Sequence, residues 1–398
     1  MSSRHLPRLL LIVCTFAVAA MAQHAVGTRV VAWPNPTSLG SPVLTARVHY
    51  PAVTAGVNAP VLPRSNGWPT VVFLHGFALL GNDYHELGDE LARAGFVAVM
   101  SNTAQLNNLT QEYDGRALFT AVCLANRCDA LSGAFDVGAI GLVGHSMGGG
   151  NVANVLANNP GYRCGLSLAP VSPLAGRAAL VHVPLGIIAG MGDSTTPLLL
   201  NAQPFYQSMT GYRQIKSLHL LSQNCNHNNV AGLLLTTAAH RAVFANARDL
   251  GVAFLRRFLL GQAAALEDTI GDHAKSGSQF VALTHEFERP QIWLAGPLRI
   301  GSRVRLSMAG EPGIAGTLAA FSQIPSPLPT PVGPLHLDPA TTIVGVYSFV
   351  GTGRRYDYTM IVPNDPAFVG VSFSLQAFGN GRNGGPILGN AIDLCIER

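Results

Sequence analysis

Apolar runs and stretches of helical periodicity alternate along the chain from residue 69 to about residue 260. Runs rich in Val, Ile and Leu are typical of buried strands, and longer stretches with a 3.6-residue repeat are typical of the helices between them. The pattern predicts strands at residues 70–74, 96–101, 139–143, 164–168, 185–189 and 215–221. It predicts helices at residues 84–94, 115–125, 147–158 and 250–260. This order is typical of a parallel sheet with crossover helices, and therefore of an α/β sandwich of three layers.

The pattern changes after residue 260. Residues 263–288 are mixed and polar, which predicts a linker between a first domain at residues 23–262 and a second domain at residues 289–398. In the second domain, short alternating segments stand between Gly and Pro residues, as in an antiparallel β-sandwich. Its candidate strands are residues 303–308, 317–322, 341–347, 357–362, 370–378 and 391–396. The Pro-rich residues 325–334 are predicted to form a stiff loop, and residues 23–66 the leading antiparallel strands of the first domain.

The first 22 residues have the features of a secretory signal peptide. Arg4 and Arg8 precede an apolar run over residues 9–20, and the small residues at Ala20 and Ala22 fit the rule for signal peptidase. We expect cleavage after Ala22 and export of the mature chain. The alternative is an uncleaved anchor, but the apolar run has about 12 residues whereas a membrane span needs about 20. No later segment has the length and apolar character of a span.

Composition narrows the class of protein. Charged residues make up 12% of the 398-residue chain and apolar residues 48%, which supplies a large core and excludes a disordered chain. The net charge of +4 comes from scattered basic residues, which argues against a nucleic-acid partner. Five cysteines follow the predicted signal peptide, an odd number, so at least one is expected to stay unpaired. Cys123 and Cys128 could close a short loop, the pairing of Cys164, Cys225 and Cys395 stays open, and no spacing suggests a zinc site.

The strongest chemical signal is the pentapeptide at residues 144–148, Gly-His-Ser-Met-Gly. It stands between a predicted strand and a predicted helix, which is the setting that a nucleophile elbow requires. A serine on such a turn presents its Oγ to a substrate, and the glycines on either side leave room for the strained backbone. Ser146 is therefore the candidate nucleophile. The pentapeptide alone could also reflect tight packing at a turn, and the strand-to-helix setting argues against that alternative.

A serine nucleophile needs a base, and the base needs an orienting carboxylate. Asp193 is the single acidic residue between Ser146 and His227, and it follows the predicted strand at residues 185–189, although it could merely cap a turn. Among the later histidines, His227 lies in a polar loop directly after a strand and is the candidate base. His219 falls inside that strand and His240 in a helical stretch, so both are weaker candidates.

The negative oxygen of a tetrahedral intermediate needs hydrogen-bond donors. One donor is expected to be the backbone N–H of Met147, the residue after the nucleophile. The other is expected to be the backbone N–H of Phe77, in the loop after the strand at residues 70–74. His75 precedes it and is assigned a structural role in this loop rather than a role in proton transfer.

These segments resemble the α/β-hydrolases that include bacterial cutinases, polyester (PET) hydrolases, chlorophyllases and dienelactone-hydrolase-like esterases. The matching text lies at residues 74–77, 94–99, 144–150 and 192–197. The resemblance implies an α/β-hydrolase fold, a catalytic triad of Ser146, Asp193 and His227, and oxyanion donors at Phe77 and Met147. The string GHSMGGG followed by D-S-x-x-P is more specific to the cutinase and polyester-hydrolase branch than to α/β-hydrolases at large.

The chain also departs from that branch. Polyester hydrolases usually carry a tryptophan where this chain has Leu174, so a substrate clamp made by Phe77 and Leu174 would suit aliphatic or bulkier acyl groups as well. Many members join the acid and histidine loops by a disulfide. Gly190 stands where its first cysteine would be, and Cys225 lies before His227 rather than after it.

The sequence therefore predicts a secreted serine carboxyl-ester hydrolase that is cutinase- or polyesterase-like and acts through an acyl-enzyme. Only about 16 residues connect the strands at 164–168 and 185–189, too few for a helical cap, so we expect a serine open to solvent and to polymeric or large esters. A short-chain, chlorophyllase-like or phospholipase-like esterase is the alternative within this class, and a non-catalytic surface-binding module is the alternative outside it. No organic cofactor is implied, because the glycines at residues 148–150 follow a serine elbow rather than forming a dinucleotide fingerprint. No metal ligand is assigned from the sequence.

The second domain is expected to bind a surface or to stabilise the enzyme. Its aromatic residues could form a binding platform or belong to its core, and their strand spacing favours the core. These residues are Trp293, Tyr347, Tyr356, Tyr358 and Phe378.

Overall fold

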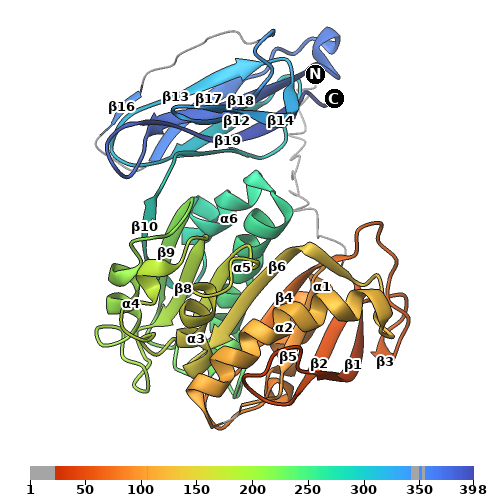
Figure 1. Cartoon of the computed structure of the whole chain (residues 1–398). Coiled ribbons are helices and arrows are strands. Elements are labelled where there is room, and N and C mark those ends of the chain that lie inside the picture. The colour runs from red at the N-terminus through yellow and green to blue at the C-terminus, as the bar shows by residue number, and fades with distance from the viewer. Residues whose placement is uncertain (1–22, 105, 342–348, 352–354) are drawn as a thin grey trace, which may run out of the picture.

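The computed structural model describes residues 23–104, 106–341, 349–351 and 355–398 (Figure 1). The predicted signal peptide at residues 1–22 lies outside the described residues. So do Tyr347 and almost all of the strand predicted at residues 341–347. Among the described residues, no helix combines the length and the apolar character needed to cross a membrane.

A ten-stranded sheet forms the centre of the first region, with the strand order β10-β9-β8-β7-β6-β4-β5-β2-β1-β3. The strands from β9 to β5 in this order run parallel. Strands β10 and β2 pair antiparallel with β9 and β5, β1 pairs antiparallel with β2, and β3 pairs parallel with β1. All six strands predicted for the parallel part are present, as are the leading antiparallel strands. The bounds are β1 Ala25–Pro34, β2 Val43–Ala52, β3 Gly56–Val57, β4 Trp68–Leu74, β5 Val97–Ser101, β6 Phe135–His145, β7 Gly165–Leu168, β8 Leu185–Gly190, β9 Ile215–Leu221 and β10 Phe280–Phe287.

Helices cover both faces of this sheet and complete three layers (Figure 1). Alternate side chains of β4 point to opposite faces: Val72 packs in a core with the helices α2, α3 and α4, and Val71 packs in a core with α1 and α5. The bounds are α1 His85–Arg93, α2 Asn108–Cys128, α3 Met147–Leu156, α4 Ala202–Ser208 and α5 Ala238–Leu260. A large mixed sheet covered by helices is the α/β architecture that the sequence predicts.

Two helices begin earlier than the hydrophobic pattern indicates, and side-chain caps set their starts. The side chain of Asn107 accepts a hydrogen bond from the backbone N–H of Thr110 at the start of α2. The side chain of Thr237 accepts one from the backbone N–H of His240 at the start of α5. Their first turns are polar, so apolar periodicity alone places the helix starts too late.

The second region consists of short antiparallel sheets. One sheet has the order β11-β12-β17, another the order β16-β13-β18-β19, and β14 and β15 form a two-stranded ribbon. The first two sheets pack face to face through a core that includes Ile292, Leu306, Leu375 and Ile392. The bounds are β11 Gln291–Ala295, β12 Arg303–Ala309, β13 Gly313–Ala320, β14 Gln323–Thr330, β15 Gly333–Leu337, β16 Phe349–Gly351, β17 Arg355–Ile361, β18 Ser372–Asn380 and β19 Pro386–Cys395. The Pro-rich residues 325–334, predicted as a stiff loop, thus lie largely in the ribbon of β14 and β15.

Residues 263–288 differ from the linker that the sequence suggests. They contain a short 3₁₀ helix at Ala263–Ala265, the helices α6 Leu266–Thr269 and α7 Asp272–Lys275, and the edge strand β10. Strand β10 pairs with β9 from Phe280 to Phe287 and extends the large sheet. Because an edge strand is half exposed, its polar residues hide the alternating pattern that identifies a strand. The sheet therefore continues past residue 262 into this segment.

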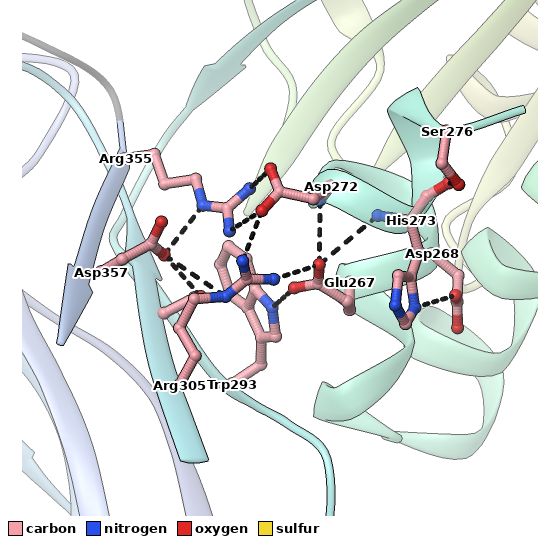
Figure 2. A network of polar contacts seen from close by, with 10 residues as sticks. Glu267, Asp268, Asp272, His273, Ser276, Trp293, Arg305, Arg355 and Asp357 are labelled. Carbon is pink, nitrogen blue, oxygen red and sulfur yellow. Dashed lines mark hydrogen bonds and ion pairs between the residues drawn. The ribbon is translucent and has the colours of Figure 1, made fainter. Parts of the chain in front are cut away.

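A polar network joins the two regions (Figure 2). The carboxylate of Glu267, which is 3% exposed, accepts hydrogen bonds from the indole N–H of Trp293 at 2.8 Å and from Arg305 at 2.6 Å. Asp272 pairs with Arg305 and with Arg355, whose guanidinium lies 2.8 Å from it. Trp293 is fully buried beneath this network, which makes it a core residue. The other aromatic residues singled out in the second domain are less buried than Trp293: Tyr356 and Phe378 are half-buried and Tyr358 is exposed.

The second region is attached at the amino-terminal edge of the parallel strands. Ile215, the first residue of β9, packs in a small core with Trp293 and Phe287. The neighbouring Arg213 pairs with Glu288 just before β11. The carboxyl ends of the parallel strands, where α/β proteins collect their functional groups, lie at the opposite edge.

All five described cysteines are free thiols. Cys123 and Cys128 both lie in α2, where a separation of five residues puts them on different sides of the helix. The short loop that the sequence suggested between them is therefore absent.

Candidate active site

Ser146 occupies a strained turn between β6 and α3. Its backbone angles are φ 56° and ψ −116°, a positive φ that a non-glycine residue rarely adopts. A Cβ on Gly144 would come within 2.2 Å of the Gly148 carbonyl oxygen, and a Cβ on Gly148 within 2.1 Å of the Leu74 carbonyl oxygen. Both glycines are therefore required for the close crossing of β6, α3 and β4 at this turn.

Asp193 lies in the acid loop, residues 191–197, directly after β8. Its Oδ1 accepts backbone hydrogen bonds from Thr195 and Thr196, each at 2.9 Å, and its Oδ2 accepts one from the Thr196 hydroxyl at 2.7 Å. Burial alone would raise the pKa of Asp193, but the hydrogen bonds from His227 and Thr196 outweigh burial and lower this pKa. The carboxylate is therefore held ionised and in a fixed orientation.

His227 lies in the histidine loop, residues 222–228, after β9. Its Nδ1 is 2.9 Å from Asp193 Oδ2, and its Nε2 is 2.9 Å from Ser146 Oγ. An Nδ1–H that donates to the carboxylate leaves Nε2 free to accept the serine proton. The structure thus brings together the three side chains that the sequence singles out, from loops that follow three different strands.

The other histidines occupy different settings. His75 is buried, with Nε2 at 2.7 Å from the Thr103 carbonyl oxygen and Nδ1 at 2.9 Å from the Gly76 carbonyl oxygen, which is a structural role. His219 is buried in β9 against the Thr269 carbonyl. His240 lies in the first turn of α5 and contacts Thr236 at 3.2 Å. The hydrogen bonds of these three histidines go to other residues and not to Ser146.

The two predicted oxyanion donors flank the serine. Met147 is the first residue of α3, so its backbone N–H is one of those at a helix start that have no partner within the helix. Phe77 follows Gly76 in the oxyanion loop, residues 75–77. A Cβ on Gly76 would lie 3.3 Å from Ser146 Cβ, so this loop runs directly beside the nucleophile.

Two glycines bring the acid loop and the histidine loop into close backbone contact. A Cβ on Gly190 would meet the Cys225 carbonyl oxygen at 2.2 Å, and a Cβ on Gly192 would meet the Gln223 carbonyl oxygen at 2.1 Å. The Gly192 N–H donates to the Cys225 carbonyl at 3.1 Å. Close backbone contact holds the loops, and the buried thiol of Cys225, whose pKa burial raises to about 12, packs against Gly190.

Ser146 is only 8% exposed, whereas apolar side chains on nearby loops are exposed. The nucleophile is therefore less open to solvent than expected. The loops that follow β4 and β7 lie next to it at Gly76 and Val171, and their exposed apolar residues, with Leu199 and Leu200, are called the rim of the site. Phe77 is 60% exposed and Leu174 46%. Leu199 and Leu200 are 72% exposed and lie beside the Leu174 loop, since the Leu200 carbonyl accepts a hydrogen bond from Ser172. The connection from β7 to β8 is fully described and holds one short 3₁₀ helix, Ala178–Leu180.

Three polar residues of the site carry no assignment from the sequence. Thr196 bonds Asp193 and lies 3.2 Å from His227 Nδ1. His145 and Tyr84 are buried and hydrogen-bonded to each other at 2.8 Å. The position of His145 next to Ser146 in the elbow is a signal in the sequence that it belongs to the site. Nothing in the sequence around Tyr84 indicates its hydrogen bond with His145. Within the described part of the chain, no group of three or more His, Cys, Asp or Glu side chains is arranged to hold a metal ion.

A family model described as PET hydrolase-like matches residues 16–263, more than half of the chain. The chain belongs to this family. The resemblance to cutinases and polyester hydrolases is thereby confirmed, and the α/β-hydrolase fold of the PET hydrolase-like family agrees with the large mixed sheet. The match ends at residue 263, before β10 and the β-rich second region.

Individual relatives are similar over shorter stretches. The bis(hydroxyethyl) terephthalate hydrolase of Streptomyces coelicolor is 26% identical over 179 residues, which is 43% of this chain and 56% of that protein. Cutinase 2 of Thermobifida cellulosilytica is 31% identical over 152 residues, 37% of this chain and 56% of the cutinase. Cutinase est1 of Thermobifida alba is 25% identical over 205 residues, 50% of this chain and 63% of the cutinase. The chain thus spans little more than half the length of these relatives.

Proposed function

We propose that the protein is a secreted serine carboxyl-ester hydrolase that acts on exposed ester bonds of polymers or other large esters. One observation carries the proposal: Asp193, His227 and Ser146 form a hydrogen-bonded series with the serine on a strained elbow. Membership of the PET hydrolase-like family, and relatives named as cutinases, support ester hydrolysis as the reaction.

In the proposed reaction, His227 Nε2 takes the proton of Ser146 as Oγ bonds to the ester carbonyl carbon. The imidazolium that forms is stabilised by the ionised Asp193 at Nδ1. The carbonyl oxygen becomes an oxyanion, which the backbone N–H groups of Phe77 and Met147 would stabilise.

The tetrahedral intermediate then collapses. The bond to the alcohol oxygen breaks, and His227 Nε2–H donates its proton to that oxygen, which leaves an acyl group on Ser146. A water molecule gives a proton to His227 as its oxygen attacks the acyl carbon. The second collapse restores the serine hydroxyl and releases the carboxylic acid.

The rim favours substrates that present apolar surface. Phe77 supplies one exposed ring beside the serine, and the other rim residues, Leu174, Leu199 and Leu200, are aliphatic. Flexible aliphatic side chains lack the flat stacking surface that an aromatic pair would offer to a terephthalate ring. We therefore propose aliphatic esters as the better substrates, with aromatic polyesters cleaved more slowly.

The test measures product release from an amorphous aromatic polyester film and from an aliphatic polyester film. Hydrolysis of p-nitrophenyl butyrate is measured in parallel, and Ser146→Ala serves as the blank. Release from both films by wild type only, faster from the aliphatic film, is the expected result. Hydrolysis of the soluble ester alone would reject polymers in favour of short-chain or lipid-like esters. Absence of hydrolysis of both films and of p-nitrophenyl butyrate would reject the proposed enzymatic function and favour a surface-binding module.

Export and domain division complete the proposal. Residues 1–22 would be removed after Ala22, so mass spectrometry of the exported protein should find Gln23 at its amino terminus. An intact chain in the medium would contradict this. The β-rich region, which begins near residue 289, would be an accessory domain, and its far surface is where a partner surface would bind.

A further inference from the structure

A chain of hydrogen bonds lies behind the catalytic groups and takes no part in the proposed reaction steps. The Gly76 N–H donates to the Tyr84 hydroxyl at 2.9 Å, and that hydroxyl lies 2.8 Å from His145 Nδ1. His145 Nε2 lies 2.7 Å from the backbone carbonyl oxygen of His227. The chain therefore connects the oxyanion loop, the elbow and the histidine loop.

Only one arrangement of protons satisfies every group in this chain. A backbone carbonyl can only accept, so His145 must carry its proton on Nε2 to meet the His227 carbonyl at 2.7 Å. Its Nδ1 must then accept, and the Tyr84 O–H is the donor that faces it. The Tyr84 oxygen in turn accepts the Gly76 N–H. All hydrogen bonds point the same way, from the oxyanion loop to the histidine loop.

Both side chains are held in the required state by burial. Tyr84 is fully buried, and burial raises its pKa far above the ordinary value, so the hydroxyl keeps its proton. Burial and the neighbouring His227 lower the pKa of His145 to about 3, so its ring is neutral and carries a single N–H. The rings of His145 and His227 lie 4.7 Å apart between centroids, where a second cation would repel the imidazolium.

We propose that Tyr84 and His145 are positioning residues that set the spacing between the oxyanion loop and the proton-accepting His227. Gly76 directly precedes Phe77, whose N–H is the proposed oxyanion donor, and the carbonyl that His145 holds belongs to the base itself. A small shift of either loop would weaken interactions made only in the transition state. This inference rests on the proposed function.

The kinetic test compares two buried tyrosines that each lose a hydroxyl. In the full chain, Tyr84→Phe is expected to lower kcat about 10- to 100-fold with KM changed less than about twofold. An alkylboronic acid, which forms a tetrahedral adduct on serine, should bind more weakly by the same factor as kcat/KM falls. Tyr162→Phe is the matched control, since Tyr162 is fully buried and its hydroxyl donates to the Gly115 carbonyl at 2.7 Å, away from Ser146. It should lose stability and keep kcat.

An unchanged kcat in Tyr84→Phe, or an equal loss in Tyr162→Phe, would overturn the inference. A second measurement is made on the wild type itself: ¹⁵N NMR of the histidine-labelled protein should show His145 neutral at pH 5 with its proton on Nε2. His145→Gln identifies the signal by its absence. A proton on Nδ1, or a cationic ring, would also overturn the inference. Failure of the wild type to hydrolyse any ester would instead reject the proposed function, and the NMR result would still decide the proton arrangement.

Discussion

The two polar networks of this molecule differ in the groups at their centres. Around Ser146, the hydrogen bonds run through the imidazole rings of His145 and His227 and the hydroxyl groups of Tyr84 and Ser146. Between the two regions, Glu267 and Asp272 face Arg305 and Arg355, which stay charged (Figure 2). Burial would raise the pKa of Glu267, but the Trp293 hydrogen bond and the arginine charges outweigh it and lower that pKa. The first network suits proton transfer, and the second suits a fixed attachment.

Burial has different consequences for charge in the two networks: it keeps His145 uncharged, whereas the contacts of Glu267 outweigh it. At the elbow, burial keeps His145 uncharged, so the site gains no permanent charge beside His227. At the attachment, Glu267 is nearly as buried but is fully paired, and its ionised state is retained. Losing a partner should therefore cost activity in one network and stability in the other.

The largest effect is expected from Asp193→Asn. An amide cannot stabilise the His227 imidazolium and favours the wrong tautomer, so kcat on p-nitrophenyl butyrate should fall about 10⁴-fold. Thermal unfolding of the variant should remain close to that of wild type. Asp249→Asn, a change at a 65% exposed carboxylate on α5, is the control and should leave kcat unchanged. A loss of less than about tenfold in Asp193→Asn would remove the carboxylate from the proposed mechanism.

At the attachment, Glu267→Gln should lower the free energy of unfolding by about 2–3 kcal/mol, because Arg305 loses its buried carboxylate partner. The kcat should not change, since the network lies at the opposite edge of the sheet from Ser146. Urea unfolding followed by fluorescence measures the loss. Glu90→Gln is the control: Glu90 pairs with Arg93 and Arg248 within the first region and is more exposed. An equal loss in both variants would mean that the attachment has no special energetic weight.

A smaller effect on activity is expected from Gly192→Ala. The added methyl group would meet the Gln223 carbonyl oxygen at 2.1 Å, so the histidine loop must move away from the acid loop. We expect kcat to fall about tenfold, as small misplacements of catalytic groups do. Gly385→Ala, at a position where nothing lies within 4 Å of an added Cβ, should be silent. Full activity in Gly192→Ala would show that the two loops need no close contact.

The smallest effect concerns pH. Burial would raise the pKa values of Glu267 and Asp272. Contacts with Arg305 and Arg355 help to outweigh burial, and both pKa values are lowered. A carboxyl whose pKa is lower in the folded than in the unfolded chain contributes stability above its unfolded pKa, near 4, and loses it as the pH falls through the folded value. The stability difference between wild type and Glu267→Gln should therefore be constant from pH 7 to about 5 and shrink below about 4. A difference that stays constant in acid would contradict this assignment.

The sequence predicts those features that depend on local patterns. The parallel strands follow from their apolar runs. Ser146 follows from the G-x-S-x-G pattern between a strand and a helix, Asp193 from being the single acidic residue before His227, and His227 from its polar loop after a strand. Edge strand β10 was not predicted, since its exposed face removes the alternation. The contact of Glu267 with Arg305 joins residues 38 positions apart, and charge alone does not specify a partner.

The same limit explains why the chain through Tyr84 and His145 was missed. Tyr84 reaches His145 across 61 positions in the sequence, and a buried tyrosine ordinarily indicates core packing. Only the fold places its hydroxyl between the Gly76 N–H and the imidazole. Local sequence therefore identifies groups that react, and tertiary structure identifies groups that hold them.

The attachment of the β-rich region to the amino-terminal edge of the parallel strands determines which way the serine faces. Ile215 begins β9 at the attachment, and His227 lies beyond the other end of the same strand. The β-rich region and the loops that carry Ser146, Asp193 and His227 therefore lie at opposite ends of the parallel strands. Under the proposed function, a surface bound by the outer face of the β-rich region would therefore differ from the surface that carries the ester attacked by Ser146.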